Sequence, residues 1–161
     1  MNLDYLFDIP PYSLSKKDKS EYLNNYFFEL TQYHYRNCNQ YKNMVNSVGF
    51  NMGERHNFSE IPFLPVRLFK MFDLLSTPRE NIVKTLTSSG TSGQAVSKIF
   101  LDKKTSLNQS KALTKIVSNY LGSKRTPMLI IDSESVLKNR NMFSARGAGI
   151  LGFSIFGRKR Y

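Results

Sequence analysis

The residues best suited to chemistry in this chain form a short polar run from Thr87 to Ser97, TSSGTSGQAVS. Glycine allows a ligand to approach the backbone closely, and hydroxyl and backbone N–H groups donate hydrogen bonds to phosphate oxygens. We therefore predict a loop that binds the phosphates of a nucleotide. Serine and threonine donate hydrogen bonds, the two glycines permit close approach, and a lysine supplies positive charge. The predicted binding residues are Ser88, Ser89, Gly90, Thr91, Ser92, Gly93 and Lys98.

The segments on either side of this run are short and apolar or β-branched, and residues 82–86 and 97–101 predict two strands. A Walker loop requires a glycine five positions after the first, but Ala95 stands there. The run also lacks the G-x-G-x-x-G of dinucleotide-binding folds. A literal match occurs at 147–152, but it follows a polar stretch and leads into an apolar segment, 150–156, predicted as a strand. We do not expect a dinucleotide site there. A plain Gly/Ser hairpin turn remains the alternative interpretation of the 87–97 run.

The run resembles the Ser/Thr-Gly-Thr-Ser/Thr-Gly signature of the acyl-activating ligase superfamily. Its exact sequence most resembles that of the acyl-protein synthetase (LuxE-type) branch. Further segments agree in order along the chain. These are IPFLPVRLFK at 61–70, SKI at 97–99 with Asp102 and Thr105, IDS at 131–133, and FSARGAG at 143–149. The resemblance extends from about Ser20 to the end of the chain.

This resemblance implies an α/β fold, the N-terminal part of an adenylate-forming enzyme, with a helical start (1–60) followed by an α/β part (61–161) containing a mainly parallel sheet. Family members are more than twice as long, so we expect residues 1–161 to be a single, incomplete N-terminal domain. The implied reaction uses ATP and Mg2+ to convert a long-chain fatty acid or other carboxylate into acyl-AMP, and then transfers the acyl group to a protein thiol. Implied partners are a fatty-acid (acyl-CoA) reductase, as in bacterial bioluminescence, or an acyl carrier.

Composition narrows the class of protein. Forty per cent of the residues are hydrophobic, including 12 Phe and 9 Tyr, which is enough for a folded core. There is no apolar run of membrane-spanning length and no signal peptide at the start, and the chain has one cysteine, so we expect a cytoplasmic protein. The formal net charge is +11, which indicates an anionic partner. ATP meets that requirement, and a basic nucleic-acid-binding domain is one alternative function. A non-catalytic remnant that binds nucleotide or scaffolds a partner is another.

Apolar periodicity predicts a helix over 18–36, begun by Ser15 and Asp18, whose aromatic face we assign to the core. Further helices are predicted over 40–48, ended by Gly49, and from Lys104 to Gly122. The continuous apolar run 128–131 predicts a strand buried on both faces, which gives a strand–helix–strand unit and a parallel sheet.

Other candidate residues carry weaker signals. Asp132 follows the predicted strand 128–131, where sites in open α/β sheets gather, but it is equally suited to cap the next turn. Arg146 can meet a carboxylate or a phosphate, although solvation alone also explains it. Cys38 is a candidate acyl acceptor, although a lone thiol in a helical region is more often inert. No metal site is expected at His34 or His56, and the catalytic residues stay unassigned.

Overall fold

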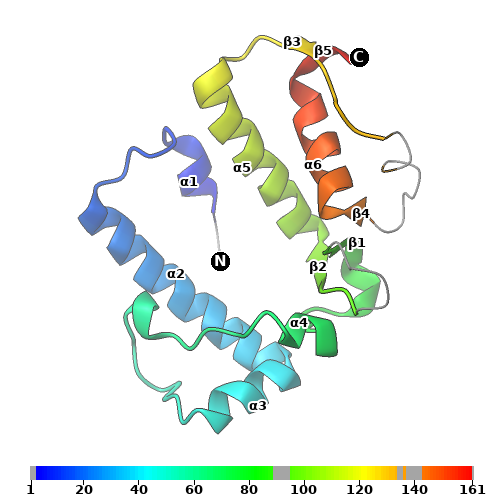
Figure 1. Cartoon of the computed structure of the whole chain (residues 1–161). Helices are drawn as coiled ribbons and strands as arrows, with labels where there is room; N and C mark the ends of the chain where they lie inside the picture. Colours follow the sequence, from blue (N-terminus) through cyan, green and yellow to red (C-terminus); the bar gives the residue numbers. More distant parts are fainter. Residues whose placement is uncertain (1–2, 89–94, 134–135, 137–142, 161) are drawn as a thin grey trace.

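The computed structural model describes residues 3–88, 95–133, 136 and 143–160. The longest helices are α2 (Lys16–Asn37) and α5 (Lys103–Leu121). In Figure 1, α5 lies beside α6 (Ala145–Phe153), and α2 belongs to the N-terminal half. Two small sheets lie at opposite ends of the α5–α6 pair. Among the described residues, no helix is long and apolar enough to cross a membrane.

The N-terminal half is helical. It contains α1 (Asp4–Asp8), α2 (Lys16–Asn37) and α3 (Asn39–Ser47). Helix α2 has the predicted Ser15 cap, whose hydroxyl accepts a hydrogen bond from the Asp18 N–H at 3.1 Å, and begins two residues before the predicted range. The second predicted helix is also confirmed, and Gly49 follows it with φ +67°, a conformation that favours glycine. An extended segment after Ile61 then leads to the short helix α4 (Leu68–Met71).

The aromatic face of α2 packs as the sequence predicts. The rings of Tyr22 and Tyr26 stack with centroids 6.1 Å apart, and Tyr22 contacts Tyr5 of α1. Phe27 stacks on Phe58 at 6.3 Å, which joins α2 to the 3-10 turn Phe58–Glu60. These rings are half-buried against one another except for Tyr5, which is exposed, so this part of the face serves packing.

The first sheet has the order β2-β1-β4. Strands β1 (Ile82–Thr87) and β2 (Lys98–Asp102) pair antiparallel, which confirms both predicted strands around the polar run. Strand β4 (Phe143–Ser144) pairs parallel with the end of β1, through Leu86 with Phe143 and Thr87 with Ser144. The second sheet contains β3 (Thr126–Met128) and β5 (Gly157–Arg160), which are parallel.

Helix α5 (Lys103–Leu121) connects the two sheets and confirms the third predicted helix. The Asp102 carboxylate caps its start by accepting from the Thr105 N–H at 2.7 Å. Gly122 ends it with φ +75° and ψ −175°, a combination almost restricted to glycine. Helix α6 (Ala145–Phe153) follows β4 directly and is continued by a 3-10 turn, Ser154–Phe156.

Three expectations about the second half are wrong. The strands form two small sheets instead of one mainly parallel sheet, and the longest pairing, β1 with β2, is antiparallel. The predicted strand 128–131 largely lies beyond β3, and Leu129 and Ile131 are 70% and 90% exposed because no described element covers them. The predicted strand 150–156 is the end of α6 and its 3-10 extension, since a continuous apolar run fits a helix as well as a strand.

The buried core is small. Among the described residues, the buried apolar side chains are Cys38, Val45 and Leu101. The accessible surface of the molecule is 11813 Å², whereas a compact monomer of this mass exposes about 8,200 Å². Large apolar side chains are exposed in both halves of the described chain, for example Phe63 at 87% and Ile131 at 90%.

Candidate functional site

The hairpin formed by β1 and β2 holds the two ends of the predicted phosphate loop together. The Ser88 N–H donates to the Ser97 carbonyl at 3.1 Å, and the Ser97 N–H donates to the Ser88 hydroxyl at 3.0 Å. The Ser88 hydroxyl therefore already accepts one hydrogen bond within the hairpin, and its own O–H can still be donated. The other predicted binding residues of the loop, Ser89, Gly90, Thr91, Ser92 and Gly93, lie outside the described residues.

Parallel pairing of β1 with β4 brings a second element to the same edge of the sheet. Thr87 pairs with Ser144, so the chain leaves β1 toward the loop at the level where it leaves β4 toward α6. Adjacent strands lie about 4.8 Å apart, and α6 also contacts β1. The first turn of α6, which contains Arg146, thus begins beside the first residues of the loop.

Arg146 and Asp132, two weaker candidates from the sequence, form an ion pair in the structure. The Nε of Arg146 lies 3.0 Å from Oδ2 of Asp132, whose side chain is 16% exposed. The Arg146 side chain remains 66% exposed. Because this contact uses Nε, the two terminal nitrogens of the guanidinium are left with donors for another oxygen ligand. Asp132 therefore holds the Arg146 cation at the edge of the sheet where the loop begins.

Lys98, the predicted counter-charge, begins β2 and bonds to Asp73 at 3.3 Å. Asp73 also pairs with Arg79 at 2.5 Å. The hydrogen bond from Arg79 and, after it, that from Lys98 hold the pKa of Asp73 below its usual value. The amine of Lys98 is therefore held toward the 73–79 segment in this structure, although its side chain is 46% exposed.

The G-x-G-x-x-G sequence at 147–152 lies inside α6 and is not the strand-to-helix turn of a dinucleotide site. A Cβ at Gly152 would lie only 3.0 Å from Cδ2 of Leu113 on α5, so glycine permits close packing of the two helices. This helical position agrees with the prediction that residues 147–152 do not form a dinucleotide-binding turn.

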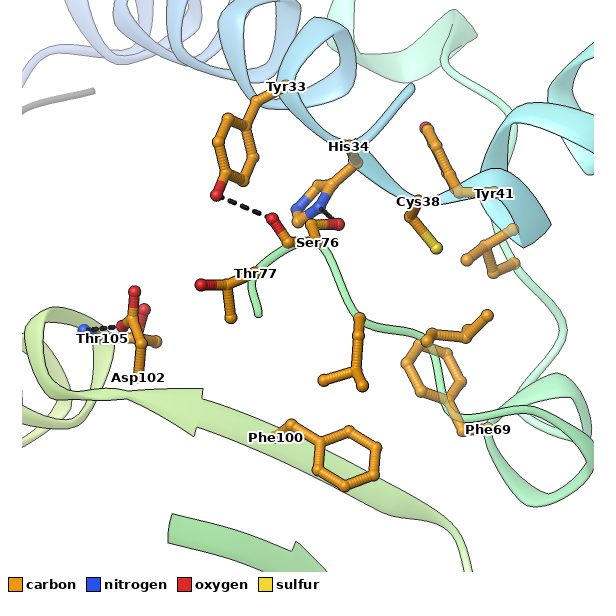
Figure 2. A pocket seen from close by; sticks show the side chains of 13 residues that line it. Tyr33, His34, Cys38, Tyr41, Phe69, Ser76, Thr77, Phe100, Asp102 and Thr105 are labelled. Atoms are coloured by element: carbon orange, nitrogen blue, oxygen red, sulfur yellow. Dashed lines mark hydrogen bonds between the residues drawn. The ribbon is translucent and has the colours of Figure 1, made fainter. Parts of the chain in front are cut away.

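A cavity of about 240 Å³ separates the helical half from the first sheet (Figure 2). Tyr33, His34 and Cys38 line it from α2 and its C-terminal end, and Phe100 and Asp102 line it from β2. Ser76 closes one side, since its hydroxyl lies 2.6 Å from Nδ1 of His34 and its carbonyl accepts from the Tyr33 hydroxyl at 2.8 Å. Burial lowers the pKa of His34, so the imidazole is neutral near pH 7.

Cys38, the candidate acyl acceptor, is 3% exposed and lines this cavity. Its sulfur lies 3.7 Å from the side-chain oxygen of Gln40, a weak hydrogen bond. His56 bonds through Nε2 to the Asn51 carbonyl at 2.7 Å. Within the described ranges, His, Cys, Asp and Glu form no group of three that could hold a metal ion.

The sequence of this chain matches the model of one protein family, "Acyl-protein synthetase, LuxE", over residues 2–159. The chain belongs to the LuxE acyl-protein synthetase family. A curated relative from Vibrio harveyi, "Long-chain-fatty-acid--luciferin-component ligase", is 27% identical over 120 residues. The matched region is 74% of this chain and 31% of the relative, so this chain spans less than a third of that ligase. No solved structure matches.

Membership of the LuxE family confirms the resemblance drawn from the ordered motifs. Two groups around the site were missed by the sequence analysis. Asp73, which bonds to both Lys98 and Arg79, lies with Arg79 in a segment that has no periodic signal. Ser76, the partner of His34, is 42 positions away from it in the chain. A short acidic-to-basic spacing, Asp73 to Arg79, is the only local signal that was available.

Proposed function

We propose that this chain contributes the phosphate-binding part of a ligase that activates a long-chain fatty acid with ATP to acyl-AMP and passes the acyl group to a protein thiol. Membership of the LuxE family over residues 2–159 is the observation that carries this proposal. The hairpin that brings Ser88 and Ser97 together supports it, because the polar loop is then presented at the end of a sheet. We also propose that the complete ligase has the adenylate-forming fold.

In the proposed reaction, a carboxylate oxygen attacks the α-phosphorus of ATP. A new P–O bond forms, the bond to the bridging oxygen of the β-phosphate breaks, and pyrophosphate leaves with the electron pair. Negative charge therefore builds on the β- and γ-phosphates, and donors fixed in advance stabilise it. The loop from Ser88 to Gly93 supplies hydroxyl and backbone donors, and Arg146 supplies a bidentate cation.

Mg2+ would arrive bound to the ATP phosphates, since this ion keeps several waters and takes few protein ligands. Asp132 is the carboxylate at the loop edge, with Oδ2 already on Arg146 and Oδ1 accepting from the Ser133 N–H at 2.6 Å. That pairing suits Asp132 to positioning Arg146 better than to direct metal ligation. In the proposed site it therefore orients the guanidinium toward the phosphates.

Fatty-acid-dependent exchange of labelled pyrophosphate into ATP, by the ligase to which this chain contributes the phosphate-binding part, tests the proposal. Thr91→Val and Gly93→Val should each reduce exchange by about 10²-fold, the usual effect of losing one positioned donor or the space for close backbone approach. Thr126→Val, the same substitution in β3 of the second sheet, is the matched control and should leave exchange unchanged. Equal exchange in all variants would contradict the loop assignment. ATP binding without exchange would instead favour a nucleotide-binding remnant.

A further inference from the structure

The cavity between α2 and β2 is lined mainly by apolar side chains. Several of its polar groups are already partnered: His34 bonds to Ser76, Tyr33 donates to the Ser76 carbonyl, and Asp102 accepts from Thr105. None of the buried side-chain nitrogen or oxygen atoms in the described part of the chain lacks a hydrogen-bond partner. An occupant would therefore gain little from polar contacts. Thr77 adds one hydroxyl to the lining, and most of the remaining wall is made by Tyr41, Leu64, Phe69, Leu74, Leu75 and Phe100.

Charge further restricts the occupant. Among the described residues that line the cavity, none is lysine or arginine, and Asp102 contributes a carboxylate whose pKa is lowered by hydrogen bonds from Thr105. The neutral His34 adds no positive charge near pH 7. A carboxylate group would lose its hydration here without gaining a cation. The cavity thus fits the hydrocarbon end of a molecule and not its charged head.

The position of β2 relates the cavity to the loop. Lys98 begins the strand directly after the loop, and Phe100 and Asp102 face the cavity farther along it. At about 3.3 Å per residue, Lys98 and Asp102 are about 13 Å apart along the strand. A carboxylate positioned near the loop could therefore extend an aliphatic chain toward the cavity.

The volume of the cavity limits the length of the aliphatic chain that it can hold. An apolar cavity of about 150 Å³ accepts benzene, so the 240 Å³ here accommodate about ten carbon atoms. We propose that this cavity binds the terminal eight to ten carbons of the aliphatic substrate. This inference rests on the proposed function for the identity of the substrate, but the binding of hydrocarbon can be tested without ATP or carboxylate.

Cys38 provides a built-in reporter. It is the only cysteine in the chain, it is 3% exposed, and Figure 2 shows its sulfur directed into the cavity. The small neutral reagent methyl methanethiosulfonate should reach Cys38 in the free protein through the cavity. A bound hydrocarbon should block that reaction. The rate of Cys38 modification, followed by mass spectrometry, therefore measures occupancy.

The experiment uses straight-chain primary alcohols from hexanol to dodecanol below their solubility limits. The alcohol concentration that halves the rate of Cys38 modification should fall about fourfold per added methylene and level off near ten carbons. At saturation, the alcohol should slow the modification at least tenfold. Leu75→Trp, which fills the cavity, should weaken decanol at least tenfold. Val83→Trp, on an exposed position of β1, should not. The chain-length series on the unmodified protein stands even if Leu75→Trp fails to fold.

Three results would overturn the inference: no modification of Cys38 in the free protein, no protection by decanol, or protection that does not depend on chain length. The two proposals fail separately. Decanol protection without pyrophosphate exchange would leave the cavity assignment standing and contradict the ligase assignment. Pyrophosphate exchange without decanol protection would leave the ligase assignment standing and contradict the cavity assignment.

Discussion

The substitution Gly149→Ala distinguishes two interpretations of residues 147–152, a helix and a nucleotide-binding turn, because they predict opposite effects on stability. It lies inside α6, and a Cβ added to it would meet no atom within 4 Å. Alanine loses less conformational entropy than glycine in a helix, so Gly149→Ala should raise the free energy of unfolding by about 0.5–1 kcal/mol. For a chain of this size, that corresponds to a rise in Tm of about 1–4 °C.

Gly122→Ala is the matched control because the same methyl group is added, again with no atom within 4 Å. Gly122 has φ +75° and ψ −175°, a backbone conformation that costs a residue with a side chain about 1–3 kcal/mol. This substitution should therefore lower the free energy of unfolding. The difference in sign between the two alanine variants comes from the backbone alone.

Urea unfolding followed by far-ultraviolet circular dichroism measures both effects in one experiment. A stabilised Gly149→Ala together with a destabilised Gly122→Ala is the expected result. If Gly149→Ala were destabilised by more than about 1 kcal/mol, the residue would need glycine for its own backbone, as in a nucleotide-binding turn. The assignment of 147–152 to a helix would then be wrong.

Three further predictions concern the elements around the site. Asp102→Ala removes the cap of α5 and should cost about 1 kcal/mol of stability in urea unfolding at pH 7, whereas Asp102→Asn should retain most of it. Burial lowers the pKa of His34 from its usual 6.5, so the unfolded chain binds more protons and stability should fall as the pH drops below 6.5; His34→Gln should remove this part of the pH dependence of the urea midpoint. Val45→Ala should lower the free energy of unfolding by about 2 kcal/mol because Val45 is 1% exposed, and Val48→Ala, at a 63% exposed position, should change it by less than about 0.5 kcal/mol; a similar loss in both would contradict the assigned core.

The features that sequence predicted well depend on contacts between near neighbours. The Ser15 cap, Gly49 and Gly122 fix the ends of three helices through interactions within a few residues. The two strands around the polar run were also found, because β-branched and apolar residues flank it on both sides. Periodicity and capping are sufficient for such elements.

The features that sequence failed to predict depend on residues far apart in the chain or on ambiguous patterns. The apolar run near 150 has too few polar residues to reveal a period, so strand and helix could not be distinguished from the sequence. The ion pair between Asp132 and Arg146 and the contact of His34 with Ser76 need the folded chain to bring them together. The cavity combines segments from four parts of the sequence, and no local motif marks it.

Direct binding of MgATP to this chain, measured by isothermal titration calorimetry, tests the central claim that the loop edge of the first sheet is a phosphate site. We predict saturable binding that weakens more than tenfold in Gly93→Val and in Arg146→Gln, since a hydrogen bond to a charged group contributes about 1.5–3 kcal/mol. Arg125→Gln, at an exposed arginine next to β3, is the control and should bind as the unmodified chain does. Absence of saturable binding, or equal affinity in all four proteins, would contradict the account.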